Sequence, residues 1–196
     1  MFDSFWSKVQ FGINHVLDIN AYDHILFLIV LTVPYQFKDW KRILLLITMF
    51  TLGHTLSLVM AVYGVISVNP KLVAFLIPLT ILIVALYNVF TAGKKAPTEK
   101  VGILFLSTLF FGLIHGLGFA GAFSSLVKKG ENKLIVLLEF ALGIELAQAA
   151  IVFVILFLSF LCQTIFRFSK RDWVVVLSAV VVGILIPMLI HSKLFT

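Results

Sequence analysis

Cysteine and charge are what this 196-residue sequence has least of. Its one cysteine, Cys162, lies in an apolar run, so no disulfide forms within the chain and neither redox chemistry nor a thiolate metal site is indicated. Only 12% of the residues are charged, whereas 61% are hydrophobic, and the mean hydropathy is +1.13. A soluble domain of this size cannot bury so much apolar surface. The composition therefore indicates an integral membrane protein.

The apolar runs lack the alternation of a transmembrane β-barrel, and their lengths approach the roughly 20 residues with which a helix crosses the hydrocarbon. We predict an all-α integral membrane protein, a compact bundle of about six transmembrane helices forming a single domain over residues 1–196. The predicted spans are residues 21–35, 40–63, 71–90, 101–127, 133–160 and 173–190.

The amino-terminal segment has no continuous apolar core before a small-residue cleavage site, so we do not expect it to be a signal peptide. Its apolar residues recur at intervals of three and four, a pattern typical of a short amphipathic helix. They are Phe2, Phe5, Trp6, Val9 and Ile13. We expect this helix to lie at the membrane interface, with Trp6 at headgroup depth.

The basic residues lie between the predicted spans, so the net charge of +6 indicates orientation in a bilayer and no nucleic-acid partner. Nine Lys and Arg residues follow the first, third and fifth spans, and six lie on the opposite side. The positive-inside tendency then predicts a multi-pass inner-membrane protein with both termini outside. The expected partners are the lipid bilayer and a metal ion, and the sequence leaves open whether the glycine faces of the helices also pair with a second copy of the chain.

Ionisable side chains interrupt the apolar spans at a similar depth, in the predicted outer half of the membrane. They are Asp23, His24, His54, His115 and Glu145. Ionisable groups inside a membrane are costly and are usually functional, and unrelated core polar groups need not share one depth. The pattern therefore favours a single site built from several helices.

His115 lies in the segment FGLIHGLGFAGAF, where it is the only ionisable group among four glycines. Gly112 and Gly116 form a small-xxx-small pair that allows another helix to approach closely, and Gly118 and Gly121 extend the same thin surface. A glycine packing seam with one hydrogen-bonded histidine is the alternative interpretation of this segment.

The other polar residues also have structural interpretations. Asp23 is placed to cap the first span, and His54 shares a polar face with Thr51 and Ser57 that suits interhelical hydrogen bonds. Candidate outer-shell residues are His15, Gln148 and Ser57.

Three imidazoles with one or two carboxylates suit a divalent transition metal, Ni, Co, Zn or Fe, and the lack of a Cys or Met cluster argues against Cu(I). A proton relay through the same groups is the alternative that needs no metal.

Four motifs carry these groups, in the order HVLDINAYDHILFL, FTLGHTLSL, FFGLIHGLGFA and EFALGIELAQ. In order and spacing they resemble the HupE/UreJ family of membrane proteins, hydrogenase and urease accessory proteins generally regarded as nickel or cobalt permeases. The resemblance matches Asp23, His24, His54, His115 and Glu145 directly. The family has five residues between a histidine and the Asp-His pair, whereas seven follow His15 here, so His15 does not align as a ligand.

The sequence leaves three functions open. One is a transporter of Ni, Co or Zn that uses these residues as its binding site. The second is an intramembrane metalloenzyme in which Glu145 or Asp23 acts as a general base on bound water. The third is a structural or chaperone-like accessory subunit. The inner side shows no second histidine cluster, which weakens the transport hypothesis and keeps the enzyme as the alternative.

Overall fold

The computed structural model describes residues 2–94, 101–127 and 130–192, and within these residues it is helical with no β-strand. The elements are α1 (Phe2–Val16), α2 (Asp23–Thr32), the 3-10 helix η1 (Phe37–Asp39), α3 (Trp40–Val62), α4 (Pro70–Thr91), α5 (Val101–Leu126), α6 (Lys133–Thr164) and α7 (Lys170–Ile190). The predicted all-α fold is confirmed.

In the described part of the chain, the helices from α3 to α7 are the five that are long and apolar enough to cross a membrane. Their bounds agree with the predicted spans to within a few residues because local capping determines where they begin. Asn69 accepts a hydrogen bond from the Lys71 amide ahead of α4, and Ser169 accepts one from Asp172 at α7. The prediction of a helical membrane bundle is confirmed.

The first predicted span is different, because α2 contains only ten residues. At 1.5 Å per residue it extends about 15 Å, roughly half the hydrocarbon thickness. The chain therefore has five full-length apolar helices in its described residues and one short helix, where six spans were predicted. The cause is Pro34, which follows the helix and has no amide hydrogen to bond the Val30 carbonyl. Asn88 of α4 donates to that carbonyl instead, at 2.6 Å.

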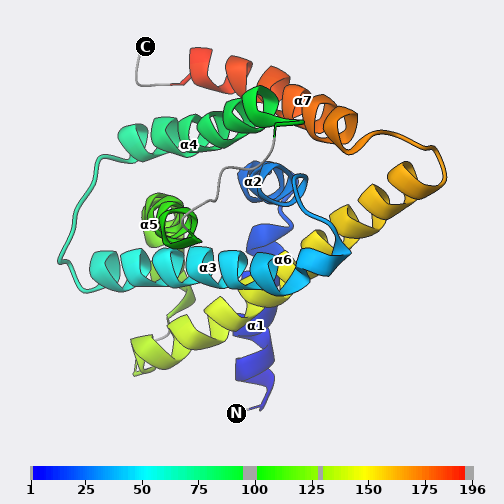
Figure 1. Ribbon diagram of the computed structural model, residues 1–196. Coiled ribbons are helices and arrows are strands. Elements are labelled where there is room, and N and C mark those ends of the chain that lie inside the picture. The colour runs from blue at the N-terminus through cyan, green and yellow to red at the C-terminus, as the bar shows by residue number, and fades with distance from the viewer. Residues whose placement is uncertain (1, 95–100, 128–129, 193–196) are drawn as a thin grey trace.

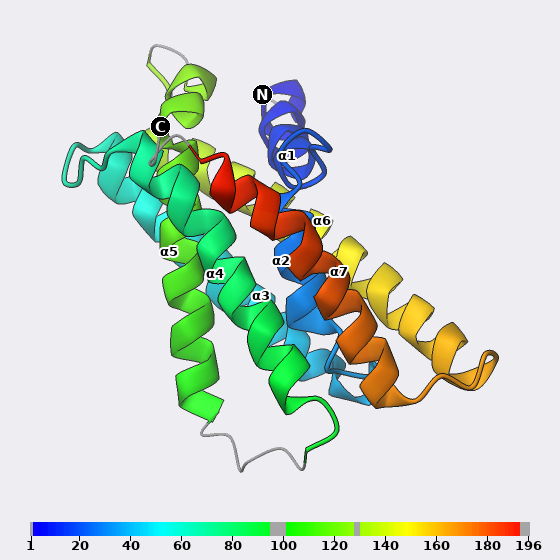
Figure 2. The same cartoon turned by 90° about the horizontal axis from the view of Figure 1, so that it is seen from above.

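The short helix lies at the centre of the molecule. Figure 1 shows α2 between the pair α4 and α7 on one side and the pair α3 and α6 on the other. Seven of its ten residues are buried, which explains why it is apolar on all sides. Figure 2 shows α1 and the C-terminal end of α7 on one side of the bundle, with the α2–α3 and α6–α7 connections on the opposite side.

Helix α1 has the predicted amphipathic character and packs across α6. Val9 is fully buried, whereas Trp6 is half exposed. Gly12 of α1 faces Gly143 of α6 so closely that a Cβ at either position would overlap a backbone carbonyl of the other helix. Lys8 is also buried and forms an ion pair with Glu131, at 2.6 Å. Two independent contacts therefore hold α1 over the bundle.

The glycines around His115 form the crossing of α5 with α3. A Cβ at Gly112 would overlap the Phe50 carbonyl, and a Cβ at Gly116 would overlap the His54 carbonyl. The predicted close approach of a helix at this pair is therefore observed. The predicted extension of the surface is not, because a Cβ at Gly118 would meet side chains of α4, and a Cβ at Gly121 would meet no atom within 4 Å among the described residues.

Candidate metal centre

The rings of four histidines converge where α1, α2, α3 and α5 meet in the described structure. They are His15, His24, His54 and His115. The His24 ring is adjacent to the other three, with centroid separations of 4.6 Å to His15, 5.7 Å to His54 and 5.6 Å to His115. Ring nitrogens of His15, His24 and His54 lie within 4.8 Å of one another.

Glycine contacts place these rings together. His15 follows Gly12 by three residues, so the α1–α6 crossing at Gly143 turns it towards the bundle centre. The His54 carbonyl occupies the space that a Cβ at Gly116 would take, so the backbones of α3 and α5 are in contact beside His115. Histidines from helices distant in sequence thus meet because no side chain separates the helices at these crossings.

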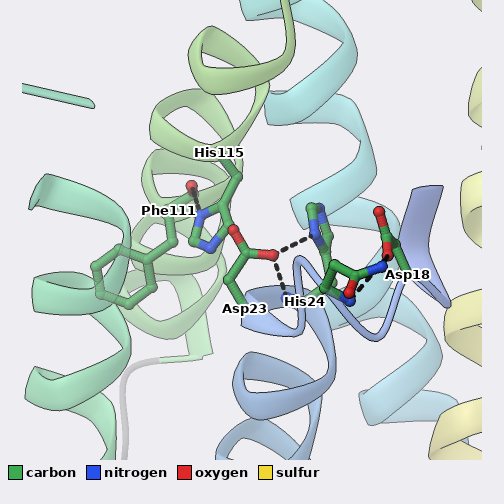
Figure 3. Close-up of polar contacts among 6 residues, drawn as sticks. Asp18, Asp23, His24, Phe111 and His115 are labelled. Carbon is green, nitrogen blue, oxygen red and sulfur yellow. Dashed lines mark hydrogen bonds and ion pairs between the residues drawn. The ribbon is translucent and has the colours of Figure 1, made fainter. Parts of the chain in front are cut away.

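Two of the rings are held in orientation by hydrogen-bond acceptors that lie next to their Nδ1 atoms. His115 Nδ1 donates to the Phe111 carbonyl at 2.8 Å, since a carbonyl oxygen only accepts. His24 Nδ1 lies 3.0 Å from the Asp23 carboxylate, which also accepts the His24 amide at 2.8 Å. Figure 3 shows that carboxylate between the His24 and His115 rings. When the rings are neutral, these contacts place the proton on Nδ1 and leave Nε2 unprotonated, the arrangement typical of metal-binding histidines.

Five other ring nitrogens of the cluster are buried without hydrogen-bond partners in the described structure. They are Nε2 of His15, His24 and His115 and both nitrogens of His54. A buried polar atom left unbonded costs about 1–3 kcal/mol, so a group of them makes the cluster a candidate site for a ligand that the rings share. Burial, followed by the neighbouring His24, lowers the pKa of His15 to about 3, so this ring is neutral at pH 7. A neutral imidazole has the lone pair that a metal requires.

Aromatic rings enclose the cluster. Phe119 lies 3.9 Å from the His15 ring, and Phe50 lies 5.0 Å from the His115 ring, between centroids. Phe119 also stacks on Phe140 at 5.3 Å. This shell is apolar and gives the imidazoles no hydrogen-bond acceptor, so it leaves their nitrogens available to an ion.

The carboxylate of Glu145 lies along α6 and is bonded to side chains of α3. The hydroxyls of Thr48 and Thr51 donate to its two oxygens, both at 2.6 Å. The Thr51 hydroxyl also lies 3.0 Å from the amide oxygen of Gln148. Thr51 precedes His54 by one helical turn. These oxygens therefore extend a row of polar side chains away from the histidines, along the interface between α3 and α6. Glu145 is not one of the residues in the close histidine group.

The candidate outer-shell residues occupy different positions. His15, which the sequence assigned to the outer shell, contributes a nitrogen directly to the close group with His24 and His54. Ser57 donates to the backbone carbonyl of His54 at 2.9 Å and so supports the helix rather than the ring. Gln148 is fully buried and contacts Thr51. The sequence signal for His15 was its spacing from Gly12, which places both residues on one face of α1.

Replacing Asp23 by asparagine tests how the His24 ring is oriented. An amide of the same shape keeps the packing but loses the charge that holds the proton on Nδ1. We expect metal affinity to fall by about 10- to 100-fold, the usual effect of losing an outer-shell partner. Isothermal titration of the purified protein with Ni²⁺ measures this. Asp18→Asn is the matched control, because the Asp18 side chain is exposed and accepts its hydrogen bonds from Asn20. Equal affinities of the two variants would contradict the role of Asp23.

Comparison with protein families supports the resemblance found in the motifs. The family model described as "HupE / UreJ protein" matches residues 1–193. The comparisons with curated proteins and with solved structures returned no match.

Proposed function

The chain belongs to the HupE/UreJ family, and we propose that it binds a divalent transition-metal ion between its converging histidines and moves that ion across the membrane. The observation that carries the proposal is the set of buried ring nitrogens without partners, two of them on rings whose tautomer is determined by Asp23 and Phe111. One nitrogen of each ring gains a bond when one ion occupies the space between the rings.

The first ligands are His15, His24 and His54, whose nitrogens lie within 4.8 Å of one another. In a metal site, donor atoms at 2.0–2.2 Å from the ion lie about 3 to 4 Å apart, so small ring rotations complete the site. His115 is the fourth ligand, because its Nε2 is buried beside His24. Asp23 holds His24 and supplies a negative charge near the ion.

The donor chemistry and the family resemblance together favour Ni²⁺ or Co²⁺ as the transported ion. Imidazole binds Ni²⁺, Co²⁺ and Zn²⁺, and the cluster contains no thiolate that would select Cu(I). Zn²⁺ fits the same nitrogens, so the choice of Ni²⁺ or Co²⁺ rests on the family.

The next binding position on the ion's path is formed by the side-chain oxygens of Glu145, Gln148 and Thr51. They lie along the α3–α6 interface, one helical turn from His54, and they supply harder, more weakly binding donors than imidazole. A site that transports must release its ion, and a step from nitrogen to oxygen ligands favours release. With both termini outside, as the basic residues indicate, this path leads inwards.

The test is uptake into liposomes that contain the purified protein and a metal-sensitive dye. We expect saturable entry of Ni²⁺ or Co²⁺, and strongly reduced entry with Glu145→Gln, which keeps the size of the side chain but removes its charge. Tight binding of the metal without entry would overturn transport and leave the binding site intact. In that case assays for hydrolysis and for metal delivery would separate the enzyme from the accessory subunit.

A further inference from the structure

A second site lies at the end of α2 that is remote from the histidines. Here the C-terminal ends of α2 and α4 meet the beginning of α7 and leave a cavity of 390 Å³. Pro34 and Asn88 line it, and the hydrogen bond from Asn88 to the Val30 carbonyl holds α4 against α2 at its wall. Cavities of this size accommodate organic ligands.

The cavity has a cationic rim. Lys94, Lys170 and Arg171 line it, and among the described residues no aspartate or glutamate does. In the part of the chain that the structure describes, none of the three forms an ion pair. The aliphatic part of Arg171 lies against Gly93, with Cδ at 3.0 Å from the position that a Cβ would take, and this contact places the guanidinium at the rim. Three cations without counterions favour an anionic ligand.

The walls between these cations are apolar. Val30, Leu31, Val84, Leu104 and Val174 line the interior, and they come from α2, α4, α5 and α7. The rim lies where α4 ends at Thr91 and α7 begins at Lys170, both of them helices able to cross a membrane. A ligand here has its charge at headgroup depth and its apolar part beside the helices.

We propose that this cavity binds an anionic phospholipid, with the headgroup phosphate held by Lys94, Lys170 and Arg171 and an acyl chain lying against the apolar walls. A free anion such as inorganic phosphate would use the rim alone and gain nothing from the valines and leucines. Basic pockets between membrane helices are suited to this ligand, since each cation near the surface adds roughly 1 kcal/mol of attraction, a factor of about five in affinity.

Native mass spectrometry of the purified full chain in detergent tests the proposal. Phosphatidylglycerol and phosphatidylcholine with the same acyl chains are titrated in parallel, with inorganic phosphate as competitor. We expect preferential retention of phosphatidylglycerol, and affinity on the order of a hundred-fold lower in the triple variant Lys94→Gln, Lys170→Gln, Arg171→Gln. The control triple, Lys38→Gln, Lys41→Gln, Arg167→Gln, removes the same charge from exposed positions at the same end of the bundle, and it should bind as the unmodified chain does.

If lipid affinity falls equally in the two triple variants, the overall positive charge of the protein attracts the lipid, and the proposed site is wrong. Equal retention of the two lipids would also overturn it, and displacement by inorganic phosphate at matched concentration would assign the rim to a free anion instead. If the triple variant aggregates, Arg171→Gln alone should lower affinity about five-fold, and Val84→Trp should block the acyl chain without changing charge.

Discussion

Replacement of His54 by glutamine is expected to abolish stoichiometric metal binding. The His54 ring is fully buried and both of its nitrogens lack partners in the described structure, so no other bond competes with the ion for them. Glutamine fills much of the same volume and stays polar, but its amide is a far weaker ligand than imidazole. The loss in affinity should exceed the 10- to 100-fold cost of removing an outer-shell partner. The measurement is the number of metal ions per protein after size-exclusion chromatography, determined by elemental mass spectrometry.

His191→Gln is the matched control for this experiment. His191 is exposed at the end of α7, and its Nδ1 bonds the Pro187 carbonyl at 2.8 Å. The substitution is the same and its position is outside the cluster, so metal content should be unchanged. If the His54 and His191 variants retain the same amount of metal, the histidine cluster is not the binding site.

The second large effect is expected at the α3–α5 crossing, where Gly116→Ala should destabilise the fold and impair metal binding together. The added methyl would overlap the His54 carbonyl and the Ser57 hydroxyl. The carbonyl belongs to a helix backbone, so the helices must separate, and such overpacking costs about 1–3 kcal/mol or more. Separation also moves His115 away from His24. Thermal unfolding in detergent and metal content are measured on the same sample.

Gly121→Ala on the same helix is the comparison. Gly121 has open space around it among the described residues, so alanine should be neutral or stabilise the helix by up to about 1 kcal/mol. The two substitutions are chemically identical, and only the crossing distinguishes them. A similar unfolding temperature for the two variants would mean that close contact between α3 and α5 does not support the site.

The convergence of His24, His54 and His115 was accessible from the sequence because helix ends and apolar lengths determine depth. Caps such as Asn69 and Ser169 are local, so the long helices could be placed within a few residues. Depth along a helix follows directly from residue number once the ends are known. Hence side chains at a similar depth could be grouped before any contact was seen.

Rotation about the helix axis and the packing of α1 could not be predicted in the same way. Glu145 was predicted at the depth of the histidines, yet its carboxylate bonds Thr48 and Thr51, and this depends on how α6 packs against α3. His15 joins the cluster because Gly12 meets Gly143, a contact between residues far apart in sequence. The amphipathic pattern of α1 predicted a helix at the interface and carried no information about the helix beneath it.

The short length of α2 was not predicted, although the sequence contains the residue that causes it. Residues 21–35 are almost continuously apolar after His24, which favoured a span, but Pro34 ends the helical hydrogen bonding after ten residues. The half-length helix places Asp23 and His24 inside the bundle instead of at its surface. Its shortness is therefore part of how the site forms.

X-ray absorption at the metal edge of the purified chain loaded with Ni²⁺ or Co²⁺ tests directly whether the histidines bind the ion. We expect one ion per chain bound by three or four imidazole nitrogens at about 2.0–2.2 Å, with no sulfur ligand. An ion surrounded chiefly by oxygen, or the absence of a stoichiometric ion in folded protein, would contradict it.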